Sequence, residues 1–197
     1  MSEGEKELQN KYGTQRRADA FYNNQMIDYV NPRMIEFINR QEMLFISPAD
    51  GEGNCDSSFR AGAPGFVRVL DASTLMYPEY RGNGVMASLG NITENPHIGL
   101  MFIDFTEQRI GLHVNGTAGI IENDALETLG LGAGEIRALN EQENNRAERW
   151  IVIKVHEAYI HCSKHIPVLK KEQSDGARRD TEHPKKKGGD FFGVKGK

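Results

Sequence analysis

Short apolar runs separated by polar turns dominate the middle of the chain. Six of these runs have the length and composition of β-strands, and they cover residues 43–47, 66–70, 74–77, 98–102, 109–121 and 149–155. The run 109–121 alternates apolar and polar positions over much of its length, and Gly116 within it is expected to mark a bulge or a tight corner. Asp71 and Ser73 suit a hairpin turn between the second and third runs. The pattern predicts a mixed, mostly antiparallel sheet that closes as a barrel.

Helical patterns flank the predicted sheet. Asn31 and Pro32 suit the N-cap and the first position of a helix whose apolar residues fall on one face. A second helix-like segment follows residue 84 and ends at Asn95-Pro96. Residues 123–129 suit a short helix that stops at Gly130.

The polarity of the two ends divides the chain into three parts. Residues 1–30 carry few large apolar side chains and suit a helical extension that lies on the body or on a partner subunit. Residues 31–170 hold the barrel, and residues 171–197 form a basic tail that ends in Gly-Gly-Asp-Phe-Phe-Gly. Two interpretations of Phe191 and Phe192 stay open: they belong to a solvated tail, or they anchor it on a partner subunit or over a cofactor.

Composition excludes several classes of protein. A chain of 197 residues with 38% hydrophobic residues suits one domain with tails. The net charge of -4 argues against nucleic acid as a general partner, and no apolar run approaches the roughly 18 residues of a membrane span. The charged N-terminus lacks a secretory pattern, so we expect a cytoplasmic protein. Cys55 and Cys162 are too few for a disulfide framework.

The candidate chemistry lies between residues 54 and 104. Two arginines, Arg60 and Arg81, occur near small hydroxyl and amide side chains, close to predicted strand ends and a helix start. Guanidinium groups bind phosphate through paired hydrogen bonds, and the first turn of a helix offers free N–H groups. Each arginine taken alone also suits a surface ion pair. Together with Ser58, Asn83 and Ser88 they favour a site for one phosphate group.

Two other patterns argue against further sites. Residues 130–134 read Gly-Leu-Gly-Ala-Gly, but they follow no strand directly, so we expect a flexible connection and not a nucleotide loop. Residues 161–165 read His-Cys-Ser-Lys-His, which is too few ligands for a structural zinc site, and we expect no metal. The chain shows no nucleophile–histidine–carboxylate pattern, so the chemistry, if any, would belong to a cofactor.

Two ordered motifs resemble those of a known family. Residues 56–71 read DxSxRxGxPGFVRVLD, and residues 77–102 read YPEYRGNGxxxSLGNIxENPHIGLMF. Over roughly residues 32–170 the chain is similar to the pyridoxamine 5'-phosphate oxidase-like family of FMN-binding split barrels, in particular to its flavoprotein branch with an Arg-Gly-Asn loop. The resemblance implies a six-stranded antiparallel split β-barrel with flanking helices. It also implies a homodimer that holds FMN at the subunit interface.

The resemblance also implies a set of cofactor-binding residues. The loop from Arg81 to Ser88 would grip the FMN phosphate, and Tyr77 and Tyr80 would flank the flat ring. A Cys-x-Lys element follows the last strand in the family, which makes Lys164 a donor to the flavin or its phosphate; a surface lysine is the alternative. The full set is Ser58, Arg60, Tyr77, Pro78, Tyr80, Arg81, Gly82, Asn83, Ser88, Asn91 and Lys164.

The implied function is that of an FMN-binding flavoprotein oxidoreductase, which transfers a hydride through the flavin to an unknown small substrate. The vitamin-making oxidase itself is not expected, because its Ser-Arg-Lys loop appears here as Arg81-Gly82-Asn83 and its Arg/Trp-rich C-terminal motif is missing. The alternative is a non-catalytic module that binds flavin, deazaflavin or haem, such as a sensor, a carrier or a haem-handling protein. His161 or His165 would then be the axial ligand of a haem.

Overall fold

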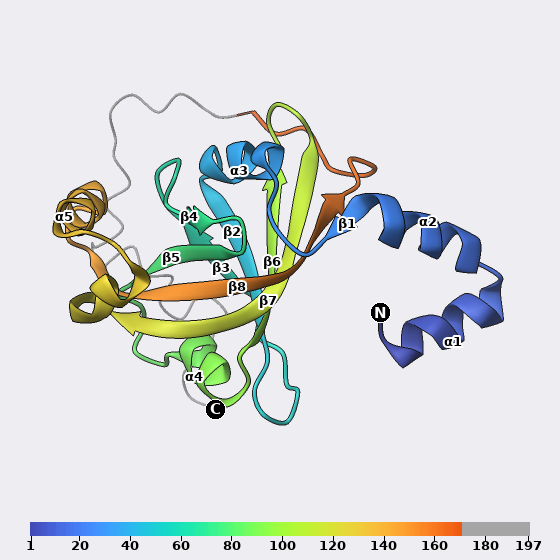
Figure 1. Ribbon diagram of the computed structural model, residues 1–197, viewed down its shortest axis with the longest axis horizontal. Helices are drawn as coiled ribbons and strands as arrows, with labels where there is room; N and C mark the ends of the chain where they lie inside the picture. The colour runs from blue at the N-terminus through green and yellow to red at the C-terminus, as the bar shows by residue number, and fades with distance from the viewer. Residues whose placement is uncertain (171–197) are drawn as a thin grey trace, which may run out of the picture.

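The computed structural model describes residues 1–170, and it folds them around one antiparallel sheet (Figure 1). The sheet has eight strands in these residues, in the order β3-β2-β6-β7-β8-β5-β4, and β1 pairs with β8. The strands are β1 (Met26–Ile27), β2 (Met43–Pro48), β3 (Ser58–Ala61), β4 (Arg68–Asp71), β5 (Thr74–Tyr80), β6 (His97–Asp104), β7 (Ile110–Glu122) and β8 (Ala147–His161).

The predicted fold class is confirmed: the chain is mainly β, with an antiparallel split-barrel sheet and flanking helices. The predicted count of six strands is wrong. One added strand, β1, is only two residues long, which is too short for a periodic signal. The other, β3, carries Ser58 and Arg60, so its polar face hid it from a search for apolar runs.

The two ends of the sheet path approach each other without pairing in the described residues. β3 lies at one end, and β4 with its neighbour β5 lies at the other. A half-buried ion pair between Arg60 on β3 and Glu79 on β5 spans this gap, with Nε and Oε2 3.0 Å apart. We call the gap between β3 and β5 the seam. Neighbouring strands elsewhere in the sheet are joined by backbone hydrogen bonds, whereas β3 and β5 are linked here by a side-chain ion pair.

Apolar side chains fill the sheet on both of its faces. The larger cluster includes Ile46, Leu100 and Val114. A smaller cluster around Trp150 packs under the 3-10 helix η1 (Asn123–Leu129) and helix α5 (Ala133–Gln142). The indole N–H of Trp150 donates to Asn123 at 2.9 Å, which satisfies a polar group that is fully buried.

The helices agree with the sequence prediction in part. Asn31 caps α3 (Pro32–Asn39) as predicted, because its side chain accepts from the N–H groups of residues 33 and 34 at 3.0 Å. The N-terminal residues form α1 (Glu3–Tyr12) and α2 (Gln15–Gln25), which bury no side chain and project away from the sheet (Figure 1). No helix in residues 1–170 combines the length and the apolar character that a membrane span needs.

The region around residue 132 differs from the prediction. Gly130 ends the 3-10 helix in the left-handed conformation, with φ of 78°, as predicted. The connection predicted over 130–134 is shorter than expected, because α5 already begins at Ala133. Gly132 caps this helix through a hydrogen bond from its N–H to Glu135 at 2.8 Å. The helix begins with alanine and glycine, which are also common in loops, so the composition did not indicate a helix start. The capping signal comes from Glu135, three residues after Gly132.

The bulge predicted at Gly116 is present. The register of β7 against β8 shifts between Asn115 and Gly116. A Cβ atom at Gly116 would lie 2.0 Å from the carbonyl oxygen of Lys154, so only glycine allows this close approach. The bulge lets the long strand bend around the barrel.

Candidate functional site

A pocket of about 700 Å³ lies at the seam of the barrel. Its walls come from four segments: β3 with the chain entering it, the end of β5 with the following loop, the first turn of α4 (Ala87–Glu94), and the start of β8. We call it the seam pocket. Of the residues predicted to bind a cofactor, it brings together Ser58, Arg60, Tyr80, Arg81, Gly82, Asn83 and Ser88.

The remaining predicted residues do not line this pocket. Tyr77 and Pro78 are buried within β5, and Asn91 lies half-buried one turn beyond Ser88 on α4. Lys164 is exposed beyond the far end of β8 and is not among the residues that line the pocket. Lys164 therefore does not contribute to the pocket of its own chain.

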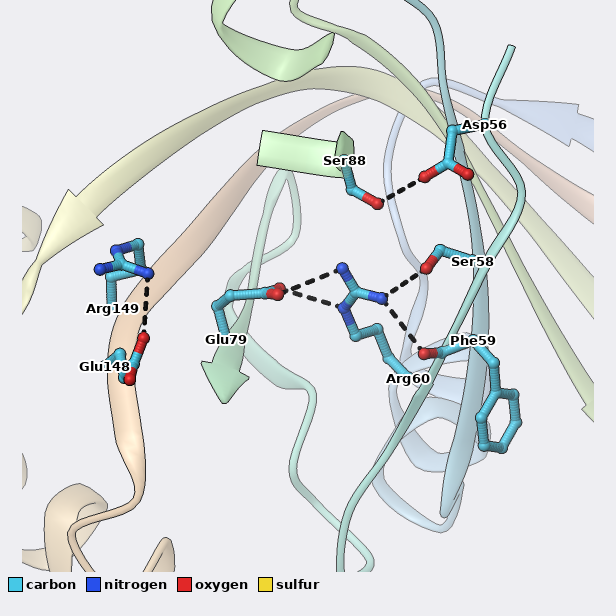
Figure 2. Close-up of polar contacts among 8 residues, drawn as sticks. All are labelled: Asp56, Ser58, Phe59, Arg60, Glu79, Ser88, Glu148 and Arg149. Carbon is cyan, nitrogen blue, oxygen red and sulfur yellow. Dashed lines mark hydrogen bonds and ion pairs between the residues drawn. The ribbon is translucent and has the colours of Figure 1, made fainter. Parts of the chain in front are cut away.

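Arg60 is largely occupied by partners within the chain (Figure 2). Its Nε and Nη2 donate to the Glu79 carboxylate at 3.0 and 3.3 Å. Its Nη1 donates to the Ser58 hydroxyl at 2.8 Å and to the carbonyl of Phe59 at 3.2 Å. Four of its five N–H donors are thus engaged. Glu79 was not among the predicted site residues, because only the curvature of the sheet brings β5 opposite β3.

Arg81 contrasts with Arg60. It is exposed at the start of the loop between β5 and α4, and it forms no hydrogen bond or ion pair with any residue in the described part of the chain. The loop around it is held in shape by Asn83, whose side chain accepts from the N–H of Val85 at 2.9 Å. Arg81 therefore offers the least encumbered guanidinium group in the pocket.

The first turn of α4 opens into the same pocket. Met86 caps the helix in the left-handed conformation, with φ of 57°, and provides no side-chain cap. The first N–H groups of the helix, at Ala87, Ser88 and Leu89, therefore remain available to a ligand. Ser88 itself is buried, and its hydroxyl donates to Asp56 at 2.7 Å (Figure 2). A helix start of this kind favours an anion.

Carboxylates offset the arginines of the pocket. Besides Arg60 and Arg81 the pocket contains Arg149, which lies 3.4 Å from Glu148 and 3.6 Å from Glu122. Asp56, Glu79 and Glu148 also line it, so three carboxylates face three guanidinium groups. Arg149 and these acidic side chains were not among the predicted site residues. The adjacent charges of Glu148 and Arg149, at the start of the last predicted strand, were a signal in the sequence that could have indicated them.

Tyr80 is fixed at the edge of the pocket by the segment after α5. Its hydroxyl donates to the Glu143 carboxylate, and the Arg146 guanidinium lies 5.2 Å from the centre of its ring. Burial, followed by the hydrogen bond to Glu143, raises the pKa of Tyr80 above its usual range. The ring is therefore neutral and held in place, as a side chain that packs beside a flat ligand needs to be.

A pair of histidines lies at the opposite end of β8. Nε2 of His113 is 2.9 Å from Nδ1 of His161, and Tyr159 stacks on His113 with ring centres 4.8 Å apart. Burial, and to a lesser degree the charge of His161, lowers the pKa of His113. The described residues hold no group of three or more His, Cys, Asp or Glu side chains placed to bind a metal ion. This pair lies outside the seam pocket.

A comparison with protein-family models matches residues 30–162 to the pyridoxamine 5'-phosphate oxidase family. The chain belongs to this family. The match covers the sheet from α3 to the end of β8, and so it includes every wall of the seam pocket. The family resemblance seen in the sequence is confirmed, whereas the branch with the Arg-Gly-Asn loop stays a prediction.

Several solved structures match parts of the chain at low sequence identity. HupZ of Group A Streptococcus is 20% identical over 72% of this chain and 99% of its own, with a TM-score of 0.49. HutZ of Vibrio cholerae, described as a heme storage protein, is 16% identical over 66% of this chain and 93% of its own, with a TM-score of 0.41. An F420 reductase is 15% identical over 64% and 94%, with a TM-score of 0.40. A search of curated proteins found no match.

Proposed function

We propose that the chain binds FMN in the seam pocket and acts as an FMN-dependent oxidoreductase on a small substrate. The observation that carries the proposal is the exposed Arg81, which has no partner among residues 1–170, beside the uncapped first turn of α4. Guanidinium and helix N–H groups are the donors that a phosphate monoester needs. The volume of about 700 Å³ lies within the range of about 300–1,000 Å³ that is usual for small-molecule sites.

The residues of the pocket divide into a phosphate end and a ring end. Arg81, Asn83 and the N–H groups of the first α4 turn would hold the phosphate. Tyr80, locked by Glu143, would bound the flat ring and limit its motion. The flavin, when bound, would supply hydride transfer, and the protein's own residues would orient it and shield it from water on one side.

Lys164 requires a second copy of the chain if it is to contribute. It lies beyond the end of β8 opposite the pocket-lining start of that strand, and it does not line the pocket of its own chain. We propose a homodimer in which each copy places this lysine near the partner's flavin. Sedimentation should then show a dimer, and Lys164→Ala should weaken FMN without changing the fold. A monomer that holds flavin tightly would contradict this arrangement.

The haem alternative finds less support in the geometry. No histidine among residues 1–170 lines the seam pocket, and His161 is already paired with His113 at the other end of β8. His165 is exposed and lies in the segment after that strand. Haem titration of the purified protein remains a direct comparison, since a Soret band lost in His161→Ala would favour haem over flavin.

The first test is cofactor binding. The purified protein should develop flavin absorbance bands that stay with it through gel filtration after FMN is added. The loaded protein should then oxidise NADH or NADPH, which separates a catalyst from a carrier. Absence of FMN binding at micromolar concentration would end the proposal.

A further inference from the structure

A site that only binds a phosphate group would not explain two features of the seam. Arg60, expected to bind the phosphate, already uses four of its five N–H donors inside the protein. On β5, across the seam from Arg60, the hydroxyl of Tyr77 is buried and makes no hydrogen bond to any described residue. Buried hydroxyl groups nearly always have a partner, because leaving one without a partner costs free energy.

Tyr77 and Glu79 face the same side of β5. They are two residues apart on one strand, so their side chains leave the strand in the same direction. The Tyr77 side chain is fully buried, and the Glu79 side chain is 15% exposed. Burial raises the pKa of Tyr77, the charge of Arg60 opposes that rise, and the charge of Glu79 adds to it. Both charges of the Arg60–Glu79 ion pair therefore act on the Tyr77 hydroxyl.

We propose that Glu79 exchanges partners when a phosphate ester binds: it releases Arg60 to the anion and accepts a hydrogen bond from the Tyr77 hydroxyl. This inference rests on the proposed function, because the same pocket receives the ligand. A phosphate offers more acceptor oxygens and more charge than a carboxylate, so it can replace Glu79 on the guanidinium group. The released carboxylate would be half-buried and unpaired, and the hydroxyl of Tyr77 supplies the missing donor.

The exchange makes Glu79 a residue that determines specificity. A ligand without a phosphate, such as riboflavin, leaves the Arg60–Glu79 pair intact and gains no affinity from Arg60. A phosphate ester must first displace the Glu79 carboxylate from Arg60. An anion with a single charge competes poorly with that carboxylate, whereas a phosphate dianion can replace it. Arg60 continues to span the seam in both states, through Glu79 in the free protein and through the phosphate in the complex.

Three variants test the exchange. Glu79→Gln should tighten FMN about tenfold, because a neutral amide competes less well for the guanidinium group, while riboflavin binding should stay unchanged. Glu148→Gln is the matched control: it removes the same charge from the same pocket but contacts Arg149, and it should change FMN binding less than twofold. Tyr77→Phe should weaken FMN about fivefold, because the released carboxylate then finds no donor.

The double variant separates the exchange from a general structural effect. In the Glu79→Gln background, Tyr77→Phe should have no further effect on FMN, because no carboxylate is released. Tyr77→Phe should leave the melting temperature of the free protein unchanged or raised, since its hydroxyl has no hydrogen-bond partner among residues 1–170. If Glu79→Gln does not fold by circular dichroism, Tyr77→Phe with FMN and riboflavin decides the question.

Isothermal titration with FMN, riboflavin and inorganic phosphate distinguishes this inference from the proposed function. Weaker FMN binding in Glu79→Gln, or equal tightening in Glu148→Gln, would overturn the exchange while leaving the flavin site intact. If the wild type binds inorganic phosphate but not FMN, the proposed function fails, and the effect of Glu79→Gln on phosphate affinity still decides the exchange. If neither FMN nor inorganic phosphate binds the wild type or Glu79→Gln, both proposals are overturned.

Discussion

Arg81→Ala is the sharpest test of the phosphate end of the seam pocket. The side chain is exposed and has no partner among the described residues, so its removal leaves no protein group unsatisfied. Any loss of ligand affinity therefore reports the contact with the ligand itself. This is not so for Arg60, whose truncation would also strand the Glu79 carboxylate.

The expected magnitude follows from the exposure of the site. A hydrogen bond to a charged group contributes about 1.5–3 kcal/mol, and the lower half of that range applies where water competes. A loss of about 1.5–2 kcal/mol corresponds to roughly 10- to 30-fold weaker FMN binding. Riboflavin carries no phosphate, so its affinity should stay within about twofold of the wild-type value.

Quenching of flavin fluorescence measures both affinities in the same buffer. Arg137→Ala is the control, because Arg137 is an exposed arginine on α5 outside the pocket and its removal changes the net charge equally. Raising the salt concentration should weaken FMN more in the wild type than in Arg81→Ala. Equal losses for FMN and riboflavin would refute the assignment, as would an Arg137→Ala variant that weakens FMN as strongly.

Three other predictions concern the scaffold of the pocket. Asn123→Ala should lower the free energy of unfolding by about 1–3 kcal/mol in urea titrations, because it leaves the buried indole N–H of Trp150 without an acceptor. Gly116→Ala should cost about 3 kcal/mol in the same assay, because its Cβ would meet a backbone carbonyl of β8 at 2.0 Å, whereas Gly119→Ala on the same strand meets nothing within 4 Å and should be nearly neutral. Burial opposes ionisation of Asp104, but backbone N–H donors of the following turn outweigh it and lower its pKa to about 2. A lowered folded-state pKa stabilises the protein above the unfolded value of 3.8, and this contribution is lost as the pH falls through the folded value of about 2. Asp104→Asn should therefore cost about 1 kcal/mol at pH 7 and much less at pH 2.

Local signals in the sequence predicted much of the fold. The cap at Asn31, the hairpin between β4 and β5, and the bulge at Gly116 all depend on neighbouring residues, and each is present. Helix α5 was missed because its first residues are glycine and alanine, which resemble a loop in composition. The sequence therefore predicted elements well wherever a single residue type enforces a backbone geometry.

The charge state of the site could not be predicted in the same way. Arg60 and Arg81 look equivalent in the motif, yet Arg60 is paired with Glu79, whereas Arg81 has no partner within the described part of the chain. Glu79 is 19 residues further along the chain than Arg60, and only the curvature of the sheet brings the two together. A motif thus identifies which side chains converge, whereas the tertiary fold decides which of them are still available.

Strand β8 connects the seam pocket with the N-terminal segment of the molecule. It hydrogen-bonds to β5 near its start, to β7 over most of its length, and to β1 near its end. Its amides can exchange with solvent deuterium only after several neighbours have separated, so they should be among the slowest in the protein. Because β8 is held by three other strands, its backbone should form a rigid side of the pocket. Changes in the site on ligand binding are then expected in the side chains across the seam.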